Sequence, residues 1–236
     1  MNLRTTLLTS AAIMAIAAVP AEARGPWYFN VSAGANWVTD DGFFAATSPT
    51  SSADTLSFAP DADVGWVISA AVGAKLEQVM HGLRLEVEGS YRDNKVNGFW
   101  TSNTGVPIFV SSGSLDIDET TWAVLANVWW DFDLGSSIRP YIGGGIGYAH
   151  SELDGSYQGG AGGTPNFNFE GDGFAWQAGG GIKFALSPNV EIGVGYRYFS
   201  APDIDVGALR RNTTNAASGN VDVNNHTVQL EMSFAM

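Results

Sequence analysis

The charged residues with the most suggestive spacing lie in the segment LRLEVEGSYR, residues 83–92. Glu86 and Glu88 stand two positions apart, so on a strand their side chains would project to the same side, roughly 6.5–7 Å from each other. Inverting glycosidases hold their two carboxyl groups at a similar separation. Arg84 and Arg92 share that side, however. Pairing of these charges inside a structure is therefore the interpretation that we prefer to catalysis.

The neighbours His150 and Ser151 offer a second candidate chemistry, the base and nucleophile of a hydrolase. Adjacent residues of a strand point to opposite faces, which makes a hydrogen-bonded pair difficult. The run IGGGIG at 142–147 lacks the third glycine and the strand–helix context of a phosphate-binding loop. No group of His, Asp and Glu has the spacing of metal ligands. We therefore expect no catalytic site, no metal site and no cofactor.

The composition excludes further classes of function. The net charge is −13, whereas nucleic-acid binding requires a basic surface. Cysteine is absent, which excludes disulfides and thiolate chemistry. A chain of 236 residues with 45% hydrophobic residues is sufficient for one good-sized domain.

Residues 1–23 have the pattern of a signal peptide. A short positive segment, Met1–Arg4, precedes an apolar run at 7–19, and Ala21-Glu22-Ala23 fits a cleavage site. A helix needs about 20 apolar residues to span a bilayer, so this run is too short for an anchor. The mature chain is therefore expected to begin at Arg24.

From there to Met236, apolar and polar residues alternate in eight segments of about ten residues each, which is the period of a β-strand. The segments are 26–38, 63–76, 83–92, 119–132, 140–150, 173–184, 190–199 and 227–236. Short and long connections alternate between them, and the four long ones lie at about 39–62, 93–118, 151–172 and 200–225.

This alternation is typical of bacterial outer-membrane barrels, which combine an even strand count with short periplasmic turns and long external loops. A secreted soluble barrel or sandwich is the competing interpretation, but its turns should be short at both ends. The sequence thus predicts an all-β fold for 24–236, a single eight-stranded antiparallel up-and-down transmembrane β-barrel with four long external loops.

The alternation also assigns two faces to the barrel wall. The apolar face would contact lipid, and aromatic residues near the ends of the segments would form girdles at the membrane interfaces. The predicted girdle residues are Trp27, Trp37, Trp66, Trp122, Trp130, Phe174, Trp176, Phe184, Tyr196, Tyr198 and Phe234.

The opposite face would fill a lumen only just wide enough for its own side chains. The predicted lumen charge network has five positive and six negative members: Lys75, Arg84, Glu86, Glu88, Arg92, Glu119, Asp131, Lys183, Glu191, Arg197 and Glu231. Buried charges must be paired, and these numbers permit it. Lys183 and Glu191 flank a turn at 186–189 symmetrically, so we expect them to be cross-strand neighbours.

The segments RPYIGGGIGYAH (139–150) and VEIGVGYRYF (190–199), with the alternating last strand, resemble the small outer-membrane β-barrel family. This family is related to the transmembrane domain of outer membrane protein A, and the resemblance is closest to its opacity-type surface proteins. It implies a filled or very narrow lumen in the outer membrane of a Gram-negative bacterium. The implied partners are outer-membrane lipids, lipopolysaccharide and the barrel-assembly machinery, which recognises an aromatic residue at the end of the last strand. Here Phe234 lies two residues before Met236.

The leading functional hypothesis is a non-enzymatic protein that serves envelope integrity or surface interaction. A narrow porin for small solutes is the alternative, and a hydrolase that uses His150 is a third. The long connections are rich in Asp and Glu. They are either simply solvated or able to capture divalent cations beside lipopolysaccharide, or to dock a basic partner. The sequence does not identify an external ligand.

Overall fold

The computed structural model describes residues 25–38, 45–47, 55–102, 114–158, 166–212 and 215–236. The predicted signal peptide, 1–23, lies outside these ranges, and so do parts of the four predicted loops. Within these ranges, no helix has both the length and the apolar character needed to cross a membrane. The described strands are β1 (Trp27–Val38), β2 (Ala45–Thr47), β3 (Thr55–Ala62), β4 (Gly65–Lys75), β5 (Leu83–Ser102), β6 (Ser114–Asp131), β7 (Ile138–Gln158), β8 (Asn166–Ser187), β9 (Val190–Asn212) and β10 (Asn215–Ala235).

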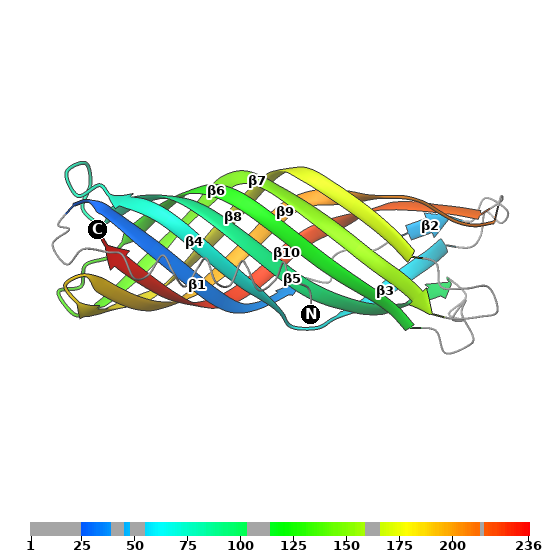
Figure 1. Cartoon of the computed structure of the whole chain (residues 1–236), viewed down its shortest axis with the longest axis horizontal. Coiled ribbons are helices and arrows are strands. Elements are labelled where there is room, and N and C mark those ends of the chain that lie inside the picture. Colours follow the sequence, from blue (N-terminus) through cyan, green and yellow to red (C-terminus); the bar gives the residue numbers. More distant parts are fainter. Residues whose placement is uncertain (1–24, 39–44, 48–54, 103–113, 159–165, 213–214) are drawn as a thin grey trace, which may run out of the picture.

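The strands form one antiparallel sheet that closes on itself (Figure 1). Around the barrel the order is β5-β4-β1-β10-β9-β8-β7-β6, and the pairing of β5 with β6 completes the ring. The first and last strands pair from Tyr28 opposite Ala235 to Val38 opposite Asn225. The predicted eight-stranded antiparallel up-and-down barrel is therefore confirmed.

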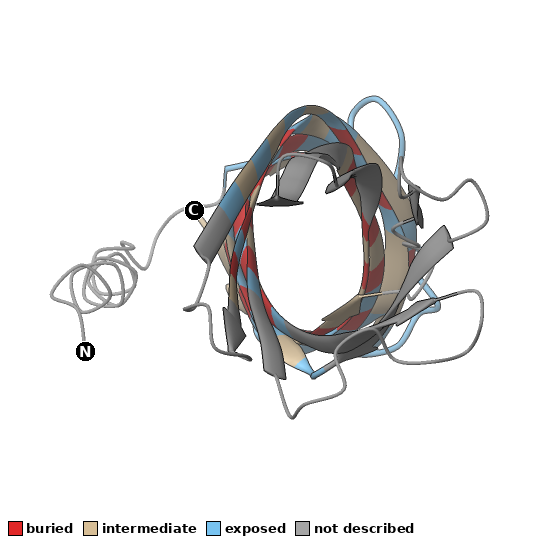
Figure 2. Cartoon of the chain, turned by 90° about the vertical axis from the view of Figure 1, so that its right-hand side faces the viewer, coloured by how far each residue is buried: buried red, intermediate tan, exposed pale blue. Residues whose placement is uncertain are grey.

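Side chains alternate strictly between the two faces of the wall. On β6, Trp122, Val124 and Val128 are exposed on the outside, whereas Leu125 and Trp129 are buried inside. A view along the barrel shows this alternation of buried and exposed residues around the ring (Figure 2). The outer face of this strand is thus apolar and is not covered by other parts of the protein. The buried core of the molecule lies in the lumen.

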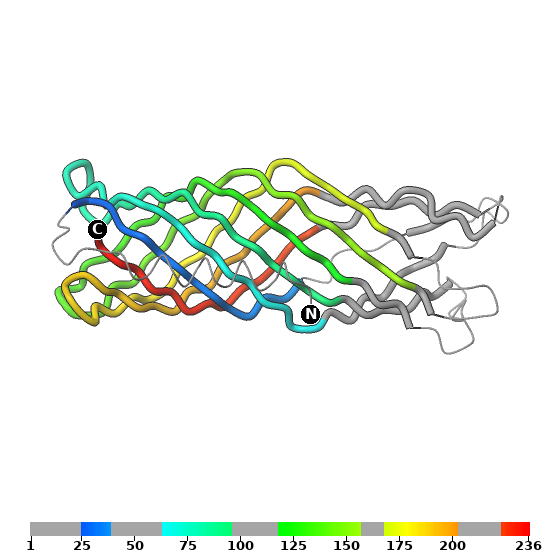
Figure 3. Tube along the Cα trace, viewed as in Figure 1, coloured from blue at the N-terminus to red at the C-terminus, as the bar shows by residue number. Residues whose placement is uncertain are grey.

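One end of the barrel carries the short turns, together with the start of β1 and the end of β10 (Figures 1 and 3). Gly82 and Gly135, with φ of 80° and 65°, allow two of these turns. In the second turn the backbone N–H of Gly135 donates to the Asp133 carboxylate, which lowers the pKa of that carboxyl group. We call this end the turn end.

The strands are much longer than predicted toward the opposite end. The prediction of about ten residues per strand is wrong for β5–β10, which have 18 to 23 residues and include much of the segments predicted as loops. The reason is an inversion of the polarity pattern. Beyond the aromatic residues Leu153 of β7 and Val223 of β10 are buried on the inner face, while Asp154 is exposed outside. The prediction required an apolar outer face, so it ended each of these strands where the inversion begins.

A hairpin in the first long connection was also not predicted. β2 pairs with β3, and β3 pairs with the far half of β5, from Leu56 opposite Ser102 to Ala62 opposite Val96. The segment 39–62, predicted as a loop, therefore adds strands to one side of the wall.

Close approach of the backbones of β6 and β7 leads to a first prediction. A Cβ at Gly147 would lie 2.0 Å from the Val124 carbonyl oxygen and 2.8 Å from Leu125 Cα. A Cβ at Gly89, on the outer face of β5, would have no atom within 4 Å. We expect Gly147→Ala to lose most of its folded barrel, because the β6–β7 ladder must separate, and Gly89→Ala to fold like the wild type.

The measurement is gel mobility of detergent-extracted protein with and without boiling. The wild type and the Gly89→Ala control should change mobility on boiling, whereas Gly147→Ala should show little of the unboiled, folded band. A Gly147→Ala variant with a full folded band would show that the wall tolerates a side chain there.

Candidate functional site in the barrel lumen

Charged side chains converge inside the barrel and are almost completely buried. The structure places all eleven predicted network residues on the inner face, and Lys75, Asp131 and Glu191 are partly exposed at the turn end. The other eight are at most 6% exposed: Arg84, Glu86, Glu88, Arg92, Glu119, Lys183, Arg197 and Glu231. Buried charges of this kind are tolerated only when they are paired and hydrogen-bonded.

The first cluster, nearest the turn end, is centred on Glu86 of β5. Arg84 lies 2.6 Å from Glu86 Oε1, and its Nε lies 2.8 Å from Asp131 Oδ2. The Tyr28 hydroxyl donates to Glu86 Oε1, and Trp129 Nε1 donates to Oε2 over 2.9 Å. The donors come from three strands, so both oxygens of Glu86 are engaged.

The second cluster is centred on Arg197 of β9. Its Nη2 lies 2.9 Å from Glu231 Oε1, which also accepts from the Tyr141 hydroxyl at 2.6 Å. Arg197 Nη1 reaches Glu88 Oε2 at 3.9 Å, and the guanidinium lies 3.9 Å from the centre of the Trp129 ring. Arg197 therefore interacts with two carboxylates that come from different strands, Glu88 of β5 and Glu231 of β10.

A third cluster lies around Arg92 and three asparagines. The Arg92 guanidinium stacks 3.7 Å from the centre of the Phe199 ring. Asn36 Nδ2 donates to Asn94 Oδ1 at 2.8 Å and to Asn225 Oδ1 at 2.9 Å, and these three side chains are at most 1% exposed. Sequence reasoning missed this layer because it considered only charged residues. The inward parity of the asparagines was the signal that could have found it.

The predicted pairing of Lys183 with Glu191 is wrong. In the structure Lys183 lies opposite Gly193, and Glu191 lies opposite Ala185. The β8–β9 turn is tighter than the four residues assumed, because Ser187 already pairs with Val190, and the register shifts between Ala185 and Ser187. Glu191 instead binds Arg139 at 2.6 Å and Lys75 at 3.6 Å.

Neither candidate catalytic pair has the geometry of an active site. Glu86 and Glu88 are each held by separate donors in the filled lumen. His150 points outward, 3.3 Å from Glu152, whereas Ser151 is fully buried inside with its Oγ 2.8 Å from Thr121 Oγ1. Among the described residues, no group of three or more His, Asp or Glu side chains could hold a metal ion.

The predicted girdle residues lie on the outer face in two bands. In the band farther from the turn end, which we call the far aromatic band, Trp66 contacts Tyr91 and Trp122 contacts Tyr148. The ring centres are 5.5 Å and 6.1 Å apart. At the turn end Trp130 stacks on Phe132 at 6.1 Å. Trp122 and Trp130 are eight residues apart on β6. At about 3.3 Å per residue and a strand tilt of about 40°, this separates the bands by about 20 Å, close to the height of an outer-membrane apolar band.

The remaining predicted girdle residues follow the same outward placement. Trp27, Phe174, Trp176, Phe184 and Tyr196 are exposed, and Trp37, Tyr198 and Phe234 are half-buried.

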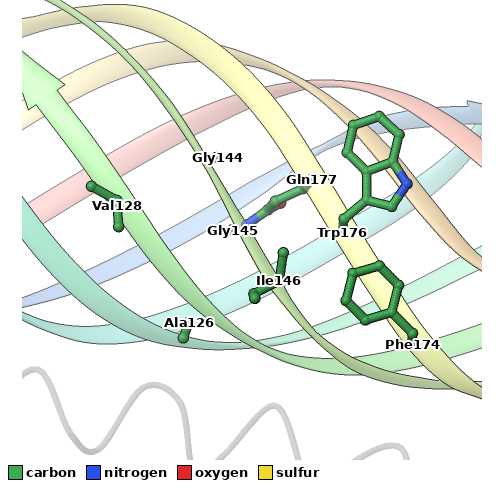
Figure 4. A pocket seen from close by; sticks show the side chains of 8 residues that line it. All are labelled: Ala126, Val128, Gly144, Gly145, Ile146, Phe174, Trp176 and Gln177. Carbon is green, nitrogen blue, oxygen red and sulfur yellow. The ribbon is translucent and has the colours of Figure 1, made fainter.

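Between the bands, the outer wall of β6–β8 is hollowed into an open groove (Figure 4). Its volume is about 620 Å³, and its lining is apolar, with Val128, Ile146, Phe174 and Trp176 around Gly144. The Gln177 side chain at its base belongs to the lumen, where it donates to Asn127 and Glu88. The groove is therefore a concave part of the apolar outer surface and not an entrance to the lumen.

The chain is similar to several known proteins. Residues 5–234 match the family model described as outer membrane protein beta-barrel domain. Outer membrane protein PagN of Salmonella typhimurium is 28% identical over 127 residues, which cover 52% of this chain and 52% of that protein. The chain thus aligns with about half the length of this relative.

Two solved structures also resemble it. OprG from Pseudomonas aeruginosa is 11% identical with a TM-score of 0.54, covering 91% of this chain and 99% of that one, and it shows the same fold. Neisserial surface protein A is 17% identical with a TM-score of 0.48, covering 89% and 97%.

The coupling between Arg197 and Glu231 gives a second prediction. Glu231→Gln leaves the guanidinium in the lumen without its nearest anion, so the free energy of unfolding should fall by about 3 kcal/mol. Arg197→Met should cost a similar amount, and the double variant should lose clearly less than the sum of the two. Urea unfolding in detergent micelles or lipid vesicles measures all three.

The matched control is Lys95→Met, which removes an exposed ion pair with Asp118 at 3.6 Å. It should change the free energy of unfolding by less than about 1 kcal/mol. Simple addition of the two single losses would mean that Arg197 and Glu231 do not depend on each other.

Proposed function

The chain belongs to the outer membrane protein β-barrel family, and we propose that it works in the outer membrane as a closed, non-conducting barrel. Its role would be structural, in envelope integrity, or in contacts at the cell surface. The proposal rests on one observation, the contact between side chains from opposite walls of the lumen.

Strands β5 and β9 lie four positions apart in the ring of eight, so they face each other across the lumen. Side chains from these two strands nevertheless meet. Arg92 of β5 stacks on Phe199 of β9, and Arg197 of β9 reaches Glu88 of β5. Two such bridges along the diameter of a lumen this narrow support a barrel that is closed to solutes.

The fixed partners of the lumen groups also support a role without catalysis. A general acid or base must reach a substrate, but Glu86 and Glu88 already bind several donors inside the wall. The His150 ring contacts the Trp122 ring in the outer aromatic band, with ring centres 5.7 Å apart, while the Ser151 side chain is buried on the opposite face. These contacts favour a packing role for the lumen residues over a catalytic one.

The outer face supports lipids and lipopolysaccharide as partners. Aromatic side chains at the two bands have the amphipathic character that suits the boundary between acyl chains and headgroups. On the last strand Phe234 lies beside Phe29 of β1 and Val190 of β9, on the outer face. That position agrees with recognition of β10 by the barrel-assembly machinery.

A role at the surface is supported by the part of the wall beyond the far aromatic band. Strands β7 and β8 continue there with polar residues such as Asp154 and Glu170 on the outer face, which suits contact with water and with partners outside the cell. Similarity to outer membrane protein PagN agrees with this location.

Planar-bilayer recording tests the closed lumen. We expect no discrete, stable openings from the wild type. The double variant Arg92→Ala and Phe199→Ala removes one of the two bridges, and with Glu88→Ala and Arg197→Ala added it should conduct. Trp176→Ala, on the outer face, is the matched control and should stay closed. Stable openings of the wild type would reject the closed barrel and favour the narrow porin.

A further inference from the structure

Lys183 is a buried cation with no carboxylate in direct contact. Its side chain projects into the lumen from β8 and is 3% exposed. Among the described residues, no carboxylate oxygen lies within ion-pair distance of its Nζ, which lies 5.2 Å from the centre of the Tyr141 ring. The charges of Glu86, Asp131, Glu191 and Glu231 act on it from farther away. Burying an ammonium is costly, and an anion in contact with it lowers that cost.

The carboxylates around Lys183 are already committed to other cations. Glu191 binds Arg139 and Lys75, while Glu86 and Asp131 both bind Arg84. Glu231, whose charge also acts on Lys183, binds Arg197 at 2.9 Å. The small pocket beside Lys183 is lined by three cations, Lys75, Arg84 and Lys183, and by one carboxylate, Glu191.

Lys183 lines a small pocket at this end of the lumen. Lys75, Arg84 and Ser233 contribute to its walls, and the β8–β9 turn at Pro188 and Asn189 borders it. Its volume is about 20 Å³, enough for one particle of about the size of a water molecule. A sulfate, a phosphate or a sugar is too large for it.

Ser233 adds a hydrogen-bond donor to this pocket. Its Oγ accepts a hydrogen bond from Asn30 Nδ2 at 2.7 Å, which leaves the hydroxyl hydrogen free to turn toward the pocket. The pocket therefore combines two ammonium groups and a hydroxyl with the volume of a single ion. Glu191 also lines the pocket, where it binds Arg139 at 2.6 Å and shares Lys75 at 3.6 Å.

We propose that the pocket binds one monatomic anion, chloride under physiological conditions, between the ammonium groups of Lys183 and Lys75 and the hydroxyl of Ser233. The anion offsets the positive charge of the pocket lining and ties β8 to β4 and β10 beside the β8–β9 turn. This site is independent of whether the lumen conducts.

Crystals soaked in bromide give the direct test, because bromide replaces chloride and scatters anomalously. The wild type should show an anomalous peak in contact with Lys183 Nζ. Lys183→Met keeps the length of the side chain and removes its charge, so its peak should be absent. Lys95→Met, which removes an exposed lysine outside the pocket, should keep the peak. Absence of the peak from the wild type, or its presence in Lys183→Met, would reject the site.

Stability in solution provides an independent test in case Lys183→Met does not fold. A ligand that binds only the folded state stabilises it in proportion to its saturation. Replacing gluconate by chloride at constant ionic strength should therefore raise the wild-type folding constant, up to about tenfold for each tenfold rise in chloride above the dissociation constant.

Lys183→Met should be equally stable in both salts, and Lys95→Met should respond like the wild type. Equal stability of the wild type in chloride and gluconate means a neutral amine or a water molecule in the pocket, and it overturns the proposal.

Discussion

The fold depends on one constraint, that no backbone amide or carbonyl group can be left unpaired in hydrocarbon. A sheet meets this constraint only by closing, as β5 and β6 do here. Closure with eight strands then fixes the width of the lumen, because barrel diameter grows with strand number. At this width side chains from opposite strands touch, so every inward residue must find a partner inside. Paired charged side chains fill the interior of this protein, where apolar side chains such as leucine would fill the interior of a soluble protein.

Glu119 and Lys183 are two buried charges of that interior that have no direct ion pair among the residues that the structure describes. Glu119 lies near the amides of Asn94 and Asn225, which supply donors without charge. Lys183 has no such carboxylate within ion-pair distance, and in our proposal an anion contacts it. Direct pairs such as Arg197 with Glu231 satisfy other charges of the lumen.

The sequence predicts the parts of this structure that follow from the period of two. The strand segments between the aromatic bands, the direction of Glu86 or Trp122, and the end of the barrel that carries the turns are all consequences of alternation and of connection length. Strand length was not predictable in the same way, because Leu153 and Val223 reverse the pattern once the outer face meets water.

The register between β8 and β9 could not be predicted from the sequence either. The β8–β9 turn is tighter than assumed, with Ser187 already opposite Val190, and this places Glu191 opposite Ala185 instead of Lys183; residue types alone reveal neither the turn length nor the adjacent bulge. The asparagine layer was missed for a different reason: its members come from β1, β5 and β10, which only the closed barrel brings together.

The length of the strands beyond the far aromatic band has a mechanical meaning. On β7 ten residues separate Tyr148 from Gln158, which corresponds to about 25 Å of hydrogen-bonded wall above the band at a tilt of about 40°. This tube acts as a stiff spacer. A partner that contacts this part of the wall meets hydrogen-bonded strands held away from the bilayer, so little backbone freedom is lost on contact. A flexible loop of the same composition would lose conformational freedom each time it bound a partner.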